Sequence, residues 1–384
     1  MSAIETTNGS RDRLASCKRV VVKVGSSLLT GPNNGLQVAK IDAYATQIAQ
    51  LAGAGYQVIL VSSGAVAAGC LRLGWSERPQ QVHLLQAAAS VGQMGLVQSY
   101  ESTLRKHGCG TAMIMLTHDD LADRQRYLNA RATLNELLSL GVVPVINEND
   151  TVATDEIRFG DNDTLAALVT NLIEADLLII LTDVEGLMDS DPRTNTGAQR
   201  VRVAASTDPA LSALAGDSVG ALGRGGMGTK IRAARLAARS GAHTLIASGE
   251  TPDVLPQLLA KDDLGTLLVA ELTPMTARKR WIAGQLRAKG DLVVDLGAAT
   301  ALRKRGVSLL AAGVVDVQGD FLRGDVVRCV TAQGEAIAQG LINYASTEVN
   351  LLRGLSSDSF MAAIGYSAEP ELMHADNLVL LRAD

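Results

Sequence analysis

The chain has 384 residues, of which 47% are hydrophobic, so it is long enough for two or three domains with substantial cores. Its formal net charge of −5 excludes a global attraction to nucleic acid or to an anionic membrane. The 4 cysteines and 5 histidines lack C-x-x-C, zinc or other metal-ligand spacing, so we predict no metal site built from protein ligands. Scattered thiols are typical of a reducing compartment.

The start of the sequence carries no targeting signal. Residues 1–18 are polar and charged, without the apolar region of a signal peptide. No apolar run approaches the roughly 20 residues that span a bilayer. We therefore expect a cytoplasmic protein. The nearest approach to a metal cluster is His118-Asp119-Asp120, which favours a solvated helix start.

Apolar, β-branched runs alternate with helical patterns along the first 270 residues. The predicted strands are 20–24, 57–61, 111–116, 142–146, 176–181 and 243–247. The predicted helices are 38–51, 82–106, 124–140 and 229–240. This alternation predicts an α/β fold, a three-layer αβα sandwich with a mainly parallel central sheet.

The rhythm changes near residue 270, where short β-type runs separated by glycine begin. These runs are 292–296, 313–317, 325–330 and 337–342. They predict a small C-terminal β-rich domain, a plausible independent module by size. The expected organisation is a flexible N-terminal extension (1–17), an α/β domain (18–270), a linker (271–288), the β-rich domain (289–370) and a C-terminal tail (371–384).

Polar residues follow several predicted strands and gather where ligands bind in open α/β sheets. Small, hydroxyl or acidic residues occupy 25–27, 62–64, 147–150 and 182–183, and the ligand crevice lies outside the carboxyl ends of parallel strands. Helix capping explains an Asp or Asn at 161 and 162, because their side chains satisfy orphan N–H groups. Capping does not explain Glu148 and Asp150 at the end of an apolar strand, so we favour a binding site. Residues 151–159 between the two clusters are compatible with a short hairpin flap.

A glycine-rich turn, Gly223–Lys230, leads directly into a predicted helix. It follows no strand and has the wrong order for a Walker A loop, but its backbone N–H groups and the helix N-terminus suit an anion. Lys230 at a helix N-terminus is unfavourable without an anionic partner. Lys23 lies within a β-branched strand, where a lysine is costly unless it is paired or enters a cleft. The alternative interpretation of the glycine-rich turn is a flexible surface loop with an ordinary lysine. The alternative for Lys23 is a position on a solvated face of the strand.

Two lysines, a glycine-rich turn and several carboxylates together predict phosphoryl transfer from a nucleotide by positioning and charge stabilisation. A hydroxyl acceptor would need a nearby base. A carboxylate acceptor, with a pKa near about 4, is already ionised at neutral pH. Its difficulty is repulsion from the triphosphate, which Lys23 and Lys230 can relieve.

From about residue 18 to near the C-terminus the sequence resembles the glutamate 5-kinase group of the amino acid kinase family. The stretches that carry the resemblance are VVVKVGSSLLT, VILVSSGAVAAG, LNARATL, VVPVINENDTVAT, FGDNDTLAAL, LLTDVEGL, DPR, AGDSVGALGRGGMGTK and RKRWIAG. The part from about residue 289 resembles a PUA domain. The family implies transfer of the γ-phosphoryl group of ATP to the γ-carboxylate of L-glutamate with Mg²⁺, the first step of proline synthesis.

The resemblance also implies roles for individual residues. Lys23 and Lys230 would hold the transferring phosphoryl group, and Asp163 would orient both lysines. The residues implied to bind glutamate are Ser63, Asp150 and Asn162, with Asp161 close by. The residues implied to bind ATP are Lys23, Thr182, Asp183, Arg224, Gly225, Gly226, Met227, Gly228, Thr229 and Lys230.

The sequence departs from the family pattern at few places. Ser62-Ser63-Gly64 replaces Thr-Ser-Gly, Arg224 replaces a smaller uncharged residue, and Gly228 replaces serine. Arg224 could add a phosphate contact or change the nucleotide preference. The reaction class is unaffected by either.

The resemblance further implies feedback inhibition by proline over the glutamate site and the flap, a homo-oligomer (dimer or tetramer), and glutamyl phosphate reductase as a channelling partner for a labile product. The main alternative is another amino acid kinase, of the acetylglutamate kinase or aspartokinase type. Asp150 argues against an N-acetyl substrate, which has no ammonium group to pair. A second alternative is an RNA-binding regulatory protein acting through its PUA-like part, although aromatic stacking platforms are scarce there.

Overall fold

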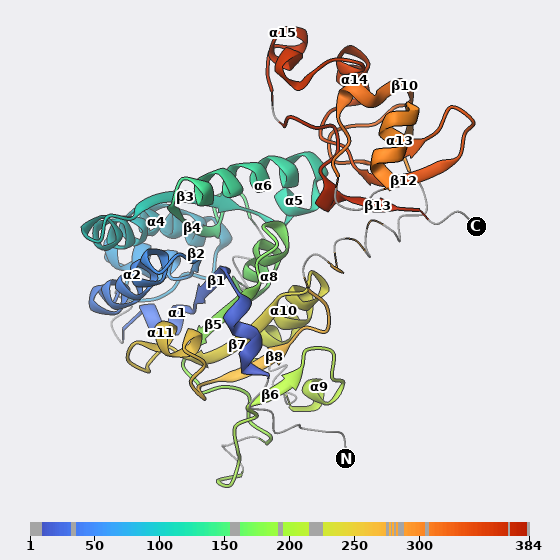
Figure 1. Ribbon diagram of the computed structural model, residues 1–384. Coiled ribbons are helices and arrows are strands. Elements are labelled where there is room, and N and C mark those ends of the chain that lie inside the picture. Colours follow the sequence, from blue (N-terminus) through green and yellow to red (C-terminus); the bar gives the residue numbers. More distant parts are fainter. Residues whose placement is uncertain are drawn as a thin grey trace. The chain divides into compact units, whose positions relative to one another are not determined.

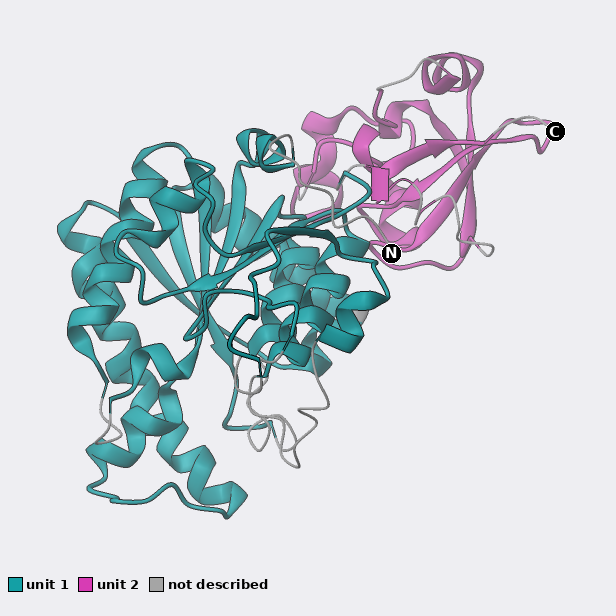
Figure 2. Ribbon diagram, turned by 90° about the horizontal axis from the view of Figure 1, so that it is seen from below, with its two compact units in different colours: residues 1–274 teal, residues 275–384 magenta. Residues whose placement is uncertain are grey.

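The chain forms two compact units, Met1–Pro274 and Met275–Asp384 (Figure 2). The computed structural model describes residues 10–31, 36–153, 162–190, 195–214, 226–273, 276–277, 279, 282, 288–303, 307–367 and 369–381. The first unit is called unit 1 and the second unit 2. The finer domain bounds expected from the sequence remain a prediction.

The centre of unit 1 is an 8-stranded sheet (Figure 1). Its strands are β1 (Arg19–Val24), β2 (Gln57–Ser62), β3 (Gly110–Leu116), β4 (Val142–Glu148), β5 (Leu177–Thr182), β6 (Val203–Ala205), β7 (His243–Ser248) and β8 (Thr266–Val269). Their order is β3-β4-β2-β1-β5-β7-β8-β6, and all neighbours are parallel except β7 and β8. The predicted mainly parallel sheet is confirmed. The sequence reading missed β6 and β8, which are only 3 and 4 residues long.

Helices cover both faces of this sheet, which confirms the three-layer sandwich (Figure 1). One layer contains α1 (Ser26–Leu29), α2 (Val38–Gly53), α3 (Ala65–Arg72), α4 (Val82–Lys106) and α11 (Val254–Leu259). The opposite layer contains α6 (Arg124–Ser139), α8 (Asn162–Leu172), α9 (Ala210–Leu214) and α10 (Met227–Arg239). A further helix, α5 (His118–Ala122), precedes α6.

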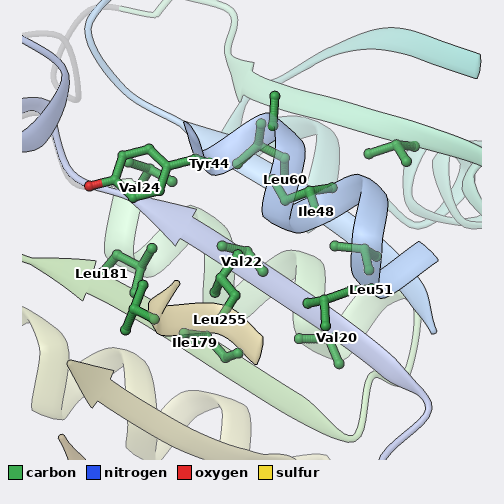
Figure 3. Packing of buried hydrophobic residues seen from close by; sticks show 14 of the residues in the cluster. Val20, Val22, Val24, Tyr44, Ile48, Leu51, Leu60, Ile179, Leu181 and Leu255 are labelled. Carbon is green, nitrogen blue, oxygen red and sulfur yellow. The ribbon is translucent and has the colours of Figure 1, made fainter. Parts of the chain in front are cut away.

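The central strand β1 shows how the sheet aims its side chains. Val20, Val22 and Val24 point to one face, where they pack with α2 and its Tyr44 (Figure 3). Side chains alternate between the faces of a strand, so Val21 and Lys23 point to the other face. Val21 belongs to the opposite hydrophobic core, whereas Lys23 lies at the carboxyl end of the strand. The interpretation of Lys23 as a residue on a solvated face is wrong, because its side chain is buried.

Helices α3 and α4 pack with their backbones in direct contact. A Cβ added at Gly69 would lie 1.7 Å from the carbonyl oxygen of Ala88, and one at Gly92 would lie 1.9 Å from the carbonyl oxygen of Ala65. These distances are far below any van der Waals contact, so only glycine fits at either place. The α3 helix also starts from Gly64, whose φ of 105° is in the left-handed region that favours glycine.

The segments expected to be an extension and a tail take part in the two units. Arg11–Ser16 is a 3-10 helix in which Leu14 is buried, and the Arg11 guanidinium donates to the carbonyl oxygens of Asp262 and Leu264. The end of the chain adds strand β13 (Leu378–Leu380), which pairs with a strand of unit 2. Residues 11–16 and 378–380 are therefore each held within their unit by packing or hydrogen bonds.

Unit 2 is built on a 5-stranded sheet, which confirms the small β-rich domain. Its strands are β9 (Gly290–Val294), β10 (Val314–Gly319), β11 (Val326–Val330), β12 (Ala336–Leu341) and β13, in the order β10-β9-β11-β12-β13. Its helices include α13 (Leu296–Arg303), α14 (Ser346–Leu352) and α15 (Phe360–Ile364). The core contains Phe321, Tyr344 and Phe360, and the last two rings meet edge to face with centroids 5.5 Å apart.

Candidate active site

The polar residues after the strands meet at one edge of the sheet of unit 1. Strand β1 pairs with β2 on one side and β5 on the other, so the chain order reverses at β1. Parallel strands bring their carboxyl ends to the same edge, and ligands bind where the strand order reverses. Lys23, Ser62 and Thr182 are at these ends of β1, β2 and β5.

The central feature of this edge is one carboxylate shared by two lysines. Lys23 Nζ lies 2.6 Å from Asp163 Oδ1, and Lys230 Nζ lies 3.2 Å from Asp163 Oδ2. The three residues come from β1, α10 and the first turn of α8. Their side chains are at most 7% exposed. Two ammonium groups that are distant in sequence are thus brought together by a single buried anion.

The charge balance of this trio determines the ionisation of Asp163. Burial alone would raise its pKa, because it disfavours the charged form. The positive charges of Lys23 and Lys230, with hydrogen bonds from Lys23 and Thr229, outweigh burial and lower the pKa of Asp163 to about 2. Asp163 is therefore ionised at neutral pH and sets one negative charge against two ammonium groups. A further anion would balance the remaining positive charge of the two lysines.

The start of α10 lies beside the same carboxylate. Thr229 Oγ1 lies 2.7 Å from Asp163 Oδ2 and 2.7 Å from the carbonyl oxygen of Gly226. Gly226 is the N-cap residue and has no side chain that could cap the first N–H groups of α10. Free N–H groups at a helix N-terminus and the helix dipole favour an anion. The anionic partner expected for Lys230 is Asp163.

Thr182 and Asp183 lie at the end of β5, where the Thr182 hydroxyl donates to Asp183 Oδ1 over 3.1 Å. Thr182 is buried and Asp183 is exposed. Met227 and Gly228, in the first turn of α10, are half-buried. Arg224, Gly225 and Asp161 lie outside the described residues, as do residues 154–159 of the expected flap.

Asn162 links helix α8 to two strands at the other part of the edge. Its Nδ2 lies 3.0 Å from the carbonyl oxygen of Ser62, 2.9 Å from Ser63 Oγ and 3.0 Å from Asn147 Oδ1. The side chain is buried although it opens the helix α8. These bonds cross from α8 to β2 and β4, so the role of Asn162 exceeds that of a helix cap.

Asp150 lies just past β4 and is half-buried. Burial raises its pKa to about 7, and the nearby Glu148 adds to the rise while Arg78 opposes it. Glu148 is itself buried, with His118 Nδ1 3.6 Å from its Oε1. Two carboxylates close together and poorly solvated are unfavourable as anions. An incoming ammonium group would relieve that repulsion.

The structure therefore brings Lys23, Lys230 and Asp163 into contact, and it bonds Ser63 to Asn162. Two buried residues that the sequence reading did not assign to the site also take part, Gln93 and Asn147. Asn147 Nδ2 donates to Gln93 Oε1 over 2.7 Å. Asn147 was visible as an amide at a strand end, whereas the signal for Gln93 is only a glutamine on the inner face of a long helix.

The expected helix start at His118 is confirmed. Thr117 caps α5 and accepts from the backbone N–H of Asp120, whose carboxylate accepts in return from the Thr117 backbone. Within the described ranges, no group of three His, Cys, Asp or Glu side chains is placed to hold a metal ion. Across the same ranges, no helix combines the length and the apolar character required to cross a membrane.

The aromatic residues of unit 2 bear on the RNA-binding alternative. Phe321, Tyr344 and Phe360 are at most 2% exposed, whereas Tyr366 is 40% exposed. Bases stack on exposed aromatic rings. Three of the four aromatic side chains that the sequence offered are thus occupied in the core, which leaves Tyr366 alone among the described residues of unit 2.

The chain matches two family models and is similar to solved structures. Residues 18–248 match the model of the amino acid kinase family, and residues 290–362 match that of the PUA domain. Among solved structures, carbamate kinase from Giardia lamblia bound to AMP-PNP is similar over 66% of this chain and 99% of that chain, with 16% sequence identity and a TM-score of 0.49.

Curated relatives are similar along nearly the whole chain. A glutamate 5-kinase from Chromohalobacter salexigens is 56% identical over 98% of this chain and 100% of its own length. One from Pseudomonas savastanoi is 58% identical over 96% of this chain and 100% of its own. One from Thioalkalivibrio sulfidiphilus is 56% identical over 97% of this chain and 99% of its own. The chain therefore belongs to the amino acid kinase family and, within it, to the glutamate 5-kinases.

Proposed function

We propose that this protein transfers the γ-phosphoryl group of ATP to the γ-carboxylate of L-glutamate, which forms L-glutamyl 5-phosphate, the first intermediate of proline synthesis. The observation that carries the proposal is the pair of buried ammonium groups, Lys23 and Lys230, held on Asp163 at the carboxyl edge of the sheet. The curated relatives bear the name of this activity.

The lysines address the main barrier of the reaction, which is repulsion between two anions. A carboxylate and a triphosphate approach each other only where positive charge offsets their own. Lys23 and Lys230 supply that charge on rigid elements, a central strand and the first turn of a helix, so little reorganisation is needed in the transition state. Asp163 is the positioning residue that holds both ammonium groups toward one point.

No general base is needed for a carboxylate acceptor, because it is already ionised at neutral pH. Its ammonium end finds a partner in Asp150, which lies beside Glu148 and gains from neutralisation. Ser63 and Asn162 contribute a hydroxyl and an amide to the acceptor, with Asp161 nearby. A carboxylate placed for the ammonium end of the acceptor favours a free amino acid over an N-acylated one, which has no ammonium group.

The nucleotide is proposed to lie along Thr182, Asp183 and the turn 224–230, with phosphates at the start of α10. Mg²⁺ supplies charge neutralisation of the phosphates when bound. Asp163 already meets two ammonium groups, so it fits a role in orienting lysines rather than in ligating a cation. We infer that the ion is held mainly by the phosphate oxygens, since Mg²⁺ commonly binds through substrate phosphates.

Other expectations of the family belong to the same proposal. We propose a cytoplasmic homo-oligomer, inhibition by proline at a site that overlaps the glutamate site and residues 151–159, and a channelling partner, glutamyl phosphate reductase, that consumes the labile acyl phosphate. The PUA-like unit is proposed to have no RNA ligand, because its described aromatic side chains are mostly in the core.

The deciding experiment measures ATP turnover with L-glutamate, N-acetyl-L-glutamate and L-aspartate, each with and without proline. The expected result is that L-glutamate has the highest kcat/KM by at least about a hundredfold, equivalent to roughly 2.7 kcal/mol. A preference for N-acetyl-L-glutamate or aspartate would instead identify one of the other amino acid kinases.

A further inference from the structure

One face of α4 carries polar residues that contact the segment following β4. Gln86, Ser90 and Gln93 have the spacing i, i+4 and i+7, which places them on one side of a helix. Gln86 Nε2 donates to the carbonyl oxygen of Ala153 over 3.0 Å, and Ser90 Oγ lies 3.1 Å from Thr151 Oγ1. These contacts hold the segment that directly follows Asp150.

The third residue of this face, Gln93, begins a chain of side-chain amides. Asn147 Nδ2 donates to Gln93 Oε1 over 2.7 Å, and Asn162 Nδ2 donates to Asn147 Oδ1 over 3.0 Å. Asn162 Nδ2 also lies 2.9 Å from Ser63 Oγ. All three amides are at most 8% exposed. The chain therefore runs from the middle of α4 to the hydroxyl at the end of β2 without reaching bulk water.

The far end of the chain fixes the direction of the Gln93 and Asn147 amides, and the carbonyl oxygen of Ser62 fixes that of Asn162. Gln93 Nε2 lies 3.4 Å from Met113 Sδ, and a thioether sulfur accepts but cannot donate a hydrogen bond. The NH₂ group of Gln93 therefore faces Met113, which leaves its oxygen toward Asn147. Asn147 must then offer its NH₂ to Gln93 and its oxygen to Asn162.

This direction determines which atoms the acceptor meets. The two N–H groups of Asn162 are shared among acceptors on Asn147, Ser62 and Ser63, and among the described residues no hydrogen bond engages its Oδ1. Ser63 Oγ accepts from Asn162, so its own proton remains available to donate. An amide oxygen suits an ammonium group, and a hydroxyl proton suits a carboxylate.

We propose that Gln93 is a positioning residue for acceptor specificity, which through Asn147 helps to hold Asn162 and Ser63 in the polarity that matches a free amino acid. The inference rests on the proposed function. Without the Gln93 oxygen, Asn147 loses the partner that holds its amide, and Asn162 keeps its bond to the Ser62 carbonyl oxygen but loses a firm contact with Asn147. A less firmly held Asn162 weakens binding of the ammonium group of the substrate and leaves the phosphoryl end unchanged.

The test compares variants of Gln93 in the full chain. Gln93→Met removes the acceptor oxygen at a similar volume, and Gln93→Asn draws it away from Asn147 by one methylene. Each is expected to raise the KM for L-glutamate about tenfold, as loss of one buried hydrogen bond does, while the KM for ATP stays within about twofold. Gln93→Glu keeps an acceptor oxygen and should restore the KM for glutamate to within about threefold of the wild type.

The matched control is Gln98→Met, the same change on the same helix at an exposed position outside the amide chain. Thermal unfolding of every variant separates a loss of folding from a loss of binding. Unchanged KM for glutamate in both Gln93→Met and Gln93→Asn overturns the proposal, as does an equal rise for glutamate and ATP, which would mark a general packing defect. A wild-type protein that does not phosphorylate glutamate refutes the proposed function instead, independently of these ratios.

Discussion

The two ends of the site bury carboxylates in opposite ways. At the phosphoryl end, Asp163 meets two ammonium groups, and its pKa falls to about 2 despite burial. At the acceptor end, Asp150 has Glu148 beside it, and burial with that repulsion raises its pKa to about 7. One end satisfies its charges within the chain, whereas the other leaves an excess of negative charge.

This contrast separates a preformed end from one that the substrate completes. Asp163 stays ionised without a ligand and already contacts both lysines, so their ammonium groups are in place when a phosphate group arrives. The acceptor end is electrostatically unfavourable until a cationic group enters. Catalytic power should therefore depend on the first end and selectivity on the second, and variants at the two ends should change different kinetic constants.

The largest effect is expected from Lys230→Ala. Its ammonium group acts mainly when charge develops on the transferring phosphoryl group, so kcat should fall about a thousandfold with little change in the KM for glutamate. Steady-state kinetics with both substrates measure this, and Lys106→Ala, at an exposed lysine of α4, is the control. Retention of kcat within about tenfold would remove Lys230 from the catalytic role.

Asp163→Asn should have the next largest effect on kcat, about a hundredfold, because both lysines lose the anion that aims them. It should also lower the free energy of unfolding by about 3 kcal/mol, since two buried ammonium groups are left without their partner. Urea unfolding measures the second quantity. The control is Asp316→Asn, which breaks the exposed pair with Arg353 and should cost less than about 1 kcal/mol. Equal losses in the two variants would contradict the role given to burial.

Asp150→Ala should act on binding and leave the phosphoryl end intact. Loss of a charge-assisted hydrogen bond to the ammonium group is expected to raise the KM for glutamate about thirtyfold, with kcat within about threefold. Initial rates over a range of glutamate concentrations test this. Asp119→Ala, at an exposed aspartate of α5, is the control. A fall in kcat without a change in KM would mean that Asp150 lies closer to the chemistry than proposed.

The smallest effect is a pH dependence that differs between the two ends. Protonation of Asp150 as pH falls through about 7 removes its attraction for an ammonium group, so the KM for glutamate should rise about tenfold between pH 8 and pH 6. Asp163 stays ionised in this range because its pKa is about 2, so it contributes no change to kcat. Asp150→Asn should have a KM that no longer varies with pH in this window.

The same raised pKa has a consequence for stability, with the sign set by linkage. The folded protein holds the Asp150 proton more tightly than the unfolded chain, whose aspartates titrate near about 3.9. Asp150 therefore lowers the free energy of unfolding as pH rises toward and through 7, and saturating glutamate should reverse that loss. Thermal unfolding at pH 6 and pH 8, with and without glutamate, measures both.

The parallel sheet and most of its helices could be predicted because β-branched runs and helical periodicity are local signals. The helix 82–106 was predicted with the bounds that it has. Strands β6 and β8 were missed because runs of 3 and 4 residues are defined by their pairing at the edge of the sheet rather than by their own composition. The unfavourable positions of Lys23 and Lys230 pointed to anionic partners, and the shared partner Asp163 follows from tertiary contact.

Gln93 could not be assigned from the sequence for a different reason. A glutamine within a long helix has many possible environments, and its significance depends on which side chain lies opposite. Here Met113 comes from β3 and Asn147 from β4, two strands that only the fold makes adjacent. Specificity that is relayed through buried amides leaves little trace in residue spacing.

The glycine contacts between α3 and α4 have a mechanical consequence. Because the two backbones touch at Gly69 and Gly92, neither helix can slide past the other without a steric collision. Helix α3 begins directly after Ser63-Gly64, and helix α4 carries Gln93. The Ser63 hydroxyl and the amide chain, which meet at Asn162, are therefore attached to two helices that cannot shift independently of each other. A force applied to the outer surface of α4, by a second subunit or a crosslink, would reach the glutamate site from both sides at once.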